Sequence, residues 1–194
     1  MKMNKLSFAT YLPDLLRNNA REHCWPKQAR SLAAVSLGRL MDESIQGIII
    51  ALDNTIISED DRYISPYAIT WIALAKKLGF KLFILSNGHR DRVTYWSEYL
   101  QIPAIQSARK PYPAAFSSAM AAMDLAPRQV VVIGDSLLTD LLGARLVGCP
   151  HIQVASLPHP LKWWEKLIGK YVKIAYPSGY ELWDFRSSSY ADRN

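Results

Sequence analysis

Several side chains suited to phosphate chemistry directly follow short apolar runs in this chain of 194 residues. Asp53 follows the run over residues 47–52, and Ser86 follows the run over residues 81–85. Further candidates lie downstream: Asn87, Lys110, Asp135 and Asp140. Carboxylates bind hard divalent cations such as Mg²⁺, while lysine supplies positive charge and serine supplies a hydrogen-bond donor for phosphate oxygens. These residue types predict a site for a phosphoryl group and a metal ion.

The apolar runs before these residues predict buried parallel strands, because they are short and rich in β-branched residues. We expect strands over residues 47–52, 81–85, 102–106, 129–133 and 151–155. Helical patterns separate them, and this alternation predicts a three-layer α/β/α Rossmann-like fold with a parallel sheet. Since reactive groups gather beyond the carboxyl ends of such strands, we expect residues 53, 86, 110 and 135 to converge on one pocket.

Four helices are expected between the strands. The first is predicted to be capped by Ser65 and to end at Gly79, and the fourth covers residues 140–147. Helical spacing predicts these apolar faces for the first three helices: Trp71, Leu74, Ala75 and Leu78; Val93, Trp96 and Leu100; Phe116, Ala119, Met120 and Met123. The basic residues that open the second helix are expected to form a solvated face, with contact to a phosphate-bearing substrate as the alternative: His89, Arg90 and Arg92.

The chain is expected to divide into three segments. Residues 1–42 form an N-terminal helical segment packed on the core, residues 43–156 form the core, and residues 157–194 form a C-terminal amphipathic helix and tail. Ser86 lies 33 residues after Asp53, and Lys110 lies 24 residues after Ser86. A helix and a strand fill most of these intervals, so a large cap domain is excluded. We therefore expect an open site that accepts a phosphate on a large molecule.

The order of these motifs resembles the haloacid dehalogenase (HAD) superfamily of phosphotransferases over residues 43–156. Residues 109–111 (Arg-Lys-Pro) and 134–140 (Gly-Asp-Ser-Leu-Leu-Thr-Asp) resemble its YqeG-type branch, subfamily IIIA, which includes phosphatidylglycerophosphate phosphatases. The resemblance implies a Mg²⁺-dependent phosphomonoester phosphatase with an aspartyl-phosphate mechanism. It also implies that phosphatidylglycerophosphate, a phosphate carried on a lipid head group, is the substrate.

The resemblance further implies a role for each polar position. Asp53 matches the residue that protonates the leaving oxygen, later activates water, and reaches the metal through its backbone carbonyl. Ser86, Asn87 and Lys110 match substrate-binding positions, and Lys110 is also an implied catalytic residue. The implied Mg²⁺ ligands are Asp53, Asp135 and Asp140. Asp140 has two alternative roles, which are to orient Lys110 or to cap its helix.

The chain departs from the family pattern at Ala51. Family members have two aspartates separated by one residue, and the first both attacks phosphorus and binds the metal; here only Asp53 remains. Loss of the nucleophile of a covalent mechanism costs on the order of 10⁶ in rate, so we expect a catalytically dead chain. An engineered change and a natural pseudophosphatase both fit this pattern. The alternative functions are non-catalytic binding of a phosphorylated ligand or partner, and dephosphorylation of nucleic-acid ends.

Composition and net charge indicate which classes of binding partner the chain favours. Hydrophobic residues make up 49% of the chain and charged residues 21%, which is typical of a globular protein. The net charge of +6 favours an anionic partner, although ordinary enzymes also reach this value. Residues 161–173, with Trp163 and Trp164 among lysines, favour peripheral contact with an anionic membrane as strongly as packing on the core. Nucleic acid is the least favoured partner, because no further basic and aromatic stripe is present.

The sequence also indicates the cellular compartment in which the protein is expected. No apolar run approaches the roughly 18 residues that a membrane-spanning helix needs, and no secretory signal is recognised. The two cysteines, Cys24 and Cys149, cannot make a disulfide framework. We therefore expect a cytoplasmic protein, with contact to the membrane surface as the peripheral alternative.

Overall fold

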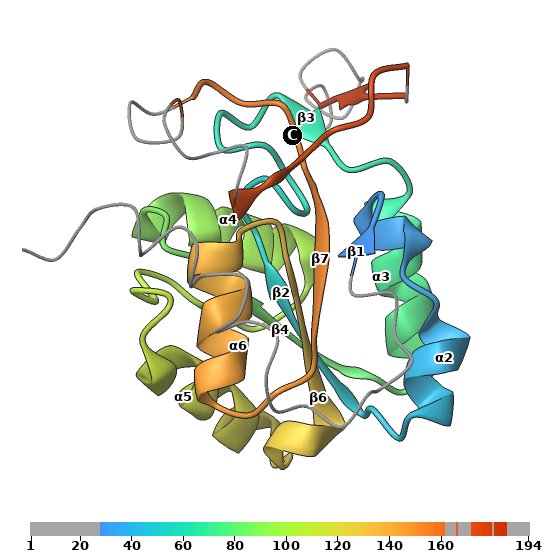
Figure 1. Cartoon of the computed structure of the whole chain (residues 1–194), viewed down its shortest axis with the longest axis vertical. Helices are drawn as coiled ribbons and strands as arrows, with labels where there is room; N and C mark the ends of the chain where they lie inside the picture. The colour runs from blue at the N-terminus through green and yellow to red at the C-terminus, as the bar shows by residue number, and fades with distance from the viewer. Residues whose placement is uncertain (1–27, 162–165, 167–171, 180, 186–194) are drawn as a thin grey trace, which may run out of the picture.

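The computed structural model describes residues 28–161, 166, 172–179 and 181–185 (Figure 1). The first 27 residues of the predicted N-terminal segment lie outside this range. So does most of the amphipathic stretch over residues 161–173, and its membrane-binding role stays a prediction. Within the described residues, no helix has the length and apolar character that crossing a bilayer requires.

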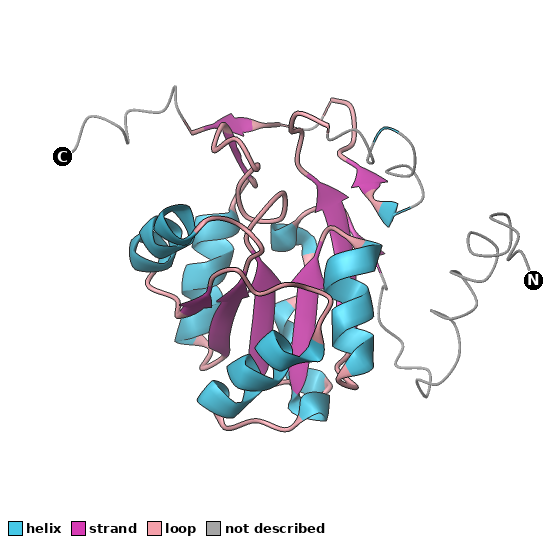
Figure 2. Cartoon of the chain, turned by 90° about the vertical axis from the view of Figure 1, so that its left-hand side faces the viewer, coloured by secondary structure: helices cyan, strands magenta, loops and turns pink. Residues whose placement is uncertain are grey.

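A parallel sheet with the strand order β1-β7-β6-β2-β4-β5 forms the centre of the molecule. The strand bounds are β1 Gln28–Ala29, β2 Gly47–Ala51, β4 Lys81–Leu85, β5 Ala104–Ile105, β6 Val130–Gly134 and β7 His151–Ser156. Every pairing between them is parallel, and Figure 2 shows the arrowheads at one end of the sheet. Because β2 pairs with β4 on one side and with β6 on the other, the strand order reverses at β2. This confirms the predicted α/β fold.

Helices lie on both faces of the sheet (Figure 1), and each face packs into a separate hydrophobic cluster. The helices and helical turns on one face are η1 (Leu32–Ala34), α2 (Leu37–Asp42), α3 (Ala68–Lys77) and α4 (Arg90–Leu100). Those on the other face are α5 (Pro113–Met123) and α6 (Leu142–Leu146). Alternation along β2 sends Ile48 and Ile50 into the first cluster and Ile49 into the second. The apolar run that predicted β2 is therefore buried on both faces.

The predicted helices are present, with a change of phase in α3. The expected faces of α4 and α5 are buried as predicted. In α3, however, Leu74 and Leu78 are 48% and 42% exposed, and the buried residues are Ala68, Trp71, Ile72 and Ala75. The i, i+3, i+4, i+7 spacing therefore holds, but it starts at Ala68 and not at Trp71. The two leucines misled the prediction because they are larger and more apolar than Ala68.

The start of α3 also differs from the prediction. Tyr67, and not Ser65, occupies the N-cap position, and its backbone is left-handed with φ 59°. Ser65 instead lies in a buried turn, where its backbone N–H donates to the carbonyl of Ile56 at 2.8 Å. The indole Nε1 of Trp71 donates to the carbonyl of Val35 at 2.8 Å, which joins α3 to the segment before α2.

Short strands bring the C-terminal segment to the carboxyl end of the sheet. β8 (Ile174–Ala175) pairs with Ala155 and Ser156 of β7, directly beyond the residues that pair with β1. β9 (Trp183–Asp184) pairs antiparallel with β3 (Tyr63–Ile64) at the same end of the molecule (Figure 1). Residues of the C-terminal segment therefore lie next to the predicted pocket.

Candidate functional site

The carboxyl ends of β2, β4 and β6 bring the predicted site residues together. Asp53 lies two residues after β2, Ser86 directly follows β4, and Asp135 directly follows β6. The hydroxyl of Ser86 donates to Oδ2 of Asp53 at 2.6 Å. Lys110, from the loop between β5 and α5, reaches the end of β4 and donates through Nζ to the carbonyl of Leu85 at 3.0 Å. These contacts make the predicted convergence a feature of the fold.

Ala51 is the last residue of β2 and is buried with 2% exposure. It lies in register with Leu85 of β4, at the carboxyl end of the sheet. Its methyl group can neither attack phosphorus nor bind a metal ion. The chemistry of the site therefore rests on the remaining residues.

Asp53 is held by a hydrogen bond and an ion pair. One carboxylate oxygen accepts from Ser86, and the other pairs with the guanidinium of Arg92. Burial raises the pKa of Asp53, but the hydrogen bond from Ser86 and the charges of Arg92 and Lys110 outweigh it, so the pKa lies below its ordinary value of 3.8. Asp53 is therefore an ionised carboxylate at neutral pH.

Arg92 belongs to the site, although the sequence favoured a solvated face for it over contact with a substrate. It was expected to belong to a solvated face, but its side chain is only 17% exposed. Nε binds Oδ1 of Asp61 at 2.8 Å, and Nη2 donates to the carbonyl of Ser58 at 3.0 Å. Its position two residues into α4, just after the end of β4, was the only signal in the sequence.

Asn87 positions the loop that carries Lys110. Its Oδ1 accepts from the backbone N–H of Lys110 at 2.7 Å, and its Nδ2 donates to the carbonyl of Lys110 at 3.2 Å. Both polar atoms of the amide are thus engaged with one backbone segment. The contacts favour a positioning role for Asn87 over direct contact with a substrate.

Lys110 and Asp140 form a buried ion pair. Nζ of Lys110 lies 2.6 Å from Oδ1 of Asp140, and the two side chains are 5% and 2% exposed. Oδ2 of Asp140 accepts from the backbone N–H of Ser136 at 3.2 Å. This arrangement depends on a single turn of π-helix, η3 (Leu137–Leu141), and on Gly134, because a Cβ at that position would overlap Asp140. The contacts favour the alternative in which Asp140 orients Lys110.

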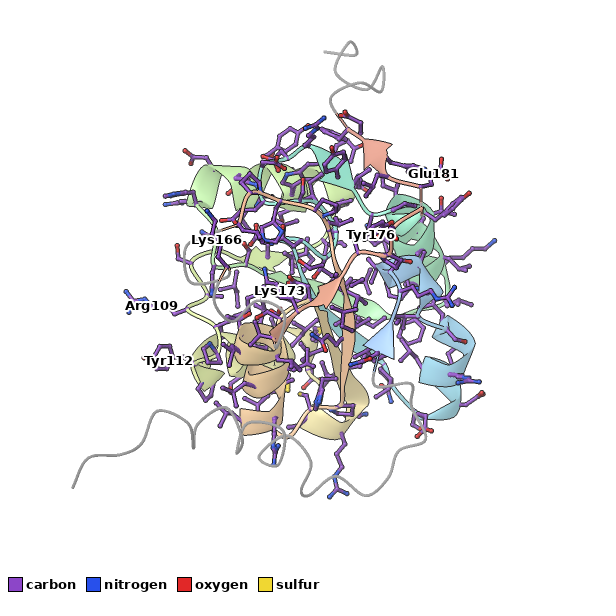
Figure 3. All side chains as sticks on the ribbon, turned by 45° about the horizontal axis from the view of Figure 1, so that its top comes forward. Arg109, Tyr112, Lys166, Lys173, Tyr176 and Glu181 are labelled. Atoms are coloured by element: carbon purple, nitrogen blue, oxygen red, sulfur yellow. The ribbon has the colours of Figure 1, made fainter. Side chains whose placement is uncertain are left out.

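Asp135 is buried, and its carboxylate contacts two residues that come later in the chain. Its Oδ2 accepts from the hydroxyl of Ser156 at 2.8 Å and lies 3.2 Å from Nζ of Lys173. Burial, together with the nearby charge of Asp140, raises the pKa of Asp135 although Lys173 lies beside it. Figure 3 tilts this end of the molecule toward the viewer and shows Lys173 near its middle, whereas Arg109 and Tyr112 project from the edge. Nothing in the sequence pairs Lys173 with Asp135.

The side chains of Asp53, Asp135 and Asp140 do not form a shared carboxylate site that fits a magnesium ion. Within the described residues, no group of three or more His, Cys, Asp or Glu side chains gathers around one point. Each predicted ligand has a cationic partner of its own: Arg92 for Asp53, Lys173 for Asp135 and Lys110 for Asp140. These pairs disfavour the side chains of Asp135 and Asp140 as metal ligands, whereas binding through the backbone carbonyl of Asp53 stays a prediction.

Comparison with known proteins agrees with this fold and these motifs. Residues 107–159 match the family described as HAD-hydrolase-like. The chain is 43% identical over 110 residues to "Probable phosphatase YqeG" of Bacillus subtilis (strain 168), which covers 57% of this chain and 64% of that protein. It is 28% identical over 92 residues to glyceraldehyde 3-phosphate phosphatase of Pyrococcus furiosus, which covers 43% of this chain and 38% of that protein. The chain thus spans less than two thirds of these relatives.

Solved structures show the same fold. A HAD family protein from Streptomyces avermitilis aligns with a TM-score of 0.50 and 22% identity, over 66% of this chain and 75% of that one. An uncharacterized protein from Listeria monocytogenes serotype 4b aligns with a TM-score of 0.50 and 16% identity, over 61% and 84% of the two chains. These comparisons show that the chain has the fold of these solved structures and that its sequence is similar to that of YqeG from Bacillus subtilis.

Proposed function

We propose that the chain binds a phosphomonoester at the carboxyl end of its sheet without hydrolysing it, on the scaffold of a HAD phosphatase. The observation that supports binding is the convergence of the Ser86 hydroxyl and the Lys110 ammonium at the end of β4. Both groups are donors, and a lysine charge beside a hydroxyl suits phosphate oxygens. The observation that supports the absence of turnover is the methyl group of Ala51 in the place of the nucleophile.

The state of Asp53 supports the same conclusion. In the related mechanism this residue protonates the leaving oxygen, which requires a carboxylic acid at working pH. Here Arg92 and Ser86 hold Asp53 in its ionised form and keep its pKa low. A lowered pKa makes Asp53 a weaker proton donor, which adds to the effect of the missing nucleophile.

An apolar cleft beside the pocket supports an amphiphilic ligand. The cleft has a volume of about 350 Å³, and its lining residues are Ile64, Ile69, Tyr99, Leu182, Trp183, Asp184 and Phe185. Trp96 connects it to the site, because its ring lies 5.0 Å from that of Phe185 and its Nε1 donates to Asp61, the partner of Arg92. A polar phosphate pocket next to an apolar cleft suits a lipid phosphate. We therefore propose phosphatidylglycerophosphate, the substrate implied by the YqeG resemblance, as the ligand.

Binding to vesicles tests this proposal. The full chain is mixed with vesicles of a neutral phospholipid to which phosphatidylglycerophosphate or, as the matched control, phosphatidylglycerol has been added. We expect binding to the first kind only, no release of inorganic phosphate, and loss of binding in Lys110→Ala. Lys77→Ala is the control variant, since this exposed lysine ends α3, away from the carboxyl ends of the strands. Equal binding to both vesicles would refute phosphate recognition, and phosphate release would refute the non-catalytic assignment.

A further inference from the structure

Lys173 is held in the candidate site by three separate interactions of the backbone around it. Its own backbone forms an antiparallel bridge with Ser136, and β8, which starts at the next residue, pairs with β7. The carbonyl of Val172 accepts from Nε2 of Gln153 at 3.1 Å, and the same Nε2 donates to the carbonyl of Asp135 at 3.0 Å. With a side chain only 12% exposed, Lys173 is a built component of the pocket.

The ammonium of Lys173 contacts Oδ2 of Asp135, the carboxylate oxygen that would bind a metal ion at this site. Nζ is 3.2 Å from Oδ2 of Asp135, the same atom that accepts from Ser156. Nζ also lies 3.4 Å from Nε2 of His159. A divalent cation bound to this oxygen would have to displace the lysine, because two cations cannot share one buried carboxylate without strong repulsion.

The exchange of a divalent ion for an ammonium matches the change of residue at position 51. Asp53, Asp135 and Asp140 each pair with a cationic side chain, and Arg92 also pairs with Asp61. Relative to a site with an aspartate at position 51 and a Mg²⁺ ion, the alanine removes one negative charge. Exchange of a divalent ion for an ammonium removes one positive charge. The two differences cancel, so a lysine and not a metal matches the charge of this particular pocket.

We propose that the ammonium of Lys173 substitutes for the divalent cation, so that the pocket binds a phosphoryl anion without a metal ion. This inference rests on the proposed function, since it names the groups that hold the phosphate. Lys173 and Lys110 supply the positive charge, and Ser86 supplies a neutral donor once its hydroxyl turns from Asp53 to the phosphate. A phosphoryl dianion then gains two charge-assisted hydrogen bonds.

Calorimetric titration of inorganic phosphate into the full chain tests the proposal, with EDTA in one series and Mn²⁺ in the other. We expect the unmodified chain to bind phosphate equally in both. Lys173→Met should weaken binding in EDTA by about tenfold to a hundredfold, the value of one charge-assisted hydrogen bond. Lys173→Arg should keep metal-independent binding, and Lys77→Met should bind like the unmodified chain. Thermal unfolding of each variant shows whether it is folded.

The spectrum of Mn²⁺ gives a second measurement that does not depend on phosphate. Free Mn²⁺ has a sharp electron paramagnetic resonance signal that is lost on binding. We expect the unmodified chain to leave this signal intact and Lys173→Met to reduce it. Uptake of Mn²⁺ by the unmodified chain, or phosphate binding that EDTA abolishes, would overturn the role of Lys173 and leave the proposed function standing. Absence of phosphate binding under both conditions would overturn the proposed function itself, and this inference with it.

Discussion

Asp140→Ala is expected to destabilise the fold strongly, because it leaves the ammonium of Lys110 buried without its carboxylate. The two side chains are 5% and 2% exposed, and Nζ and Oδ1 lie 2.6 Å apart. Breaking a buried pair by removing one partner costs about 3–5 kcal/mol, since the remaining charge is neither paired nor hydrated. The backbone N–H of Ser136 also loses its acceptor, which adds about 1 kcal/mol. We therefore expect the free energy of unfolding to fall by about 4–6 kcal/mol.

Urea unfolding followed by circular dichroism measures this loss. The matched control is the double variant Lys110→Met with Asp140→Leu, which removes both charges at once. Its stability should recover most of the loss, because replacing a buried ion pair by apolar side chains is often neutral. A loss below about 1 kcal/mol in Asp140→Ala would refute this account, since that is the range of a solvent-exposed ion pair.

Three further predictions concern the site and its surroundings. Ala51→Asp should give Mg²⁺-dependent phosphate release from phosphatidylglycerophosphate vesicles. Adding Lys173→Met to this variant should lower the Mg²⁺ concentration that the reaction requires. Inactivity of both variants on every phosphomonoester would contradict the phosphatase scaffold. Since the pKa of Asp53 is below 3.8 in the folded chain, its contribution to stability is complete above that pH and is lost as the pH falls through the folded pKa. Asp53→Asn should therefore lose less stability than the unmodified chain on acidification, as measured by urea midpoints across the acid range, and an unchanged slope would contradict the ion pair. Burial raises the pKa of Cys149 to about 12, so in a Cys24→Ser variant a thiol reagent at pH 8 should label the chain only after denaturation.

The positions of the main strands follow from local features of the sequence. Runs such as residues 47–52 are apolar at every position, which only a strand covered on both faces tolerates. The helices between them force parallel pairing, and parallel pairing places Asp53, Ser86 and Asp135 at one edge. By contrast, β1, β8 and β9 have two residues each, too few for any periodicity to be recognised.

The sequence by itself determined which chemical groups the site contains and which one it lacks. A methyl group at position 51 excludes covalent catalysis there in any conformation, because reactivity belongs to the atoms of the side chain. Only the tertiary structure decided which charges meet. Arg92 follows Asp53 by 39 residues and Lys173 follows Asp135 by 38, yet both pairs are in contact. Coulomb energy depends on distance in space and on burial, and neither quantity is written in the spacing of residues along the chain.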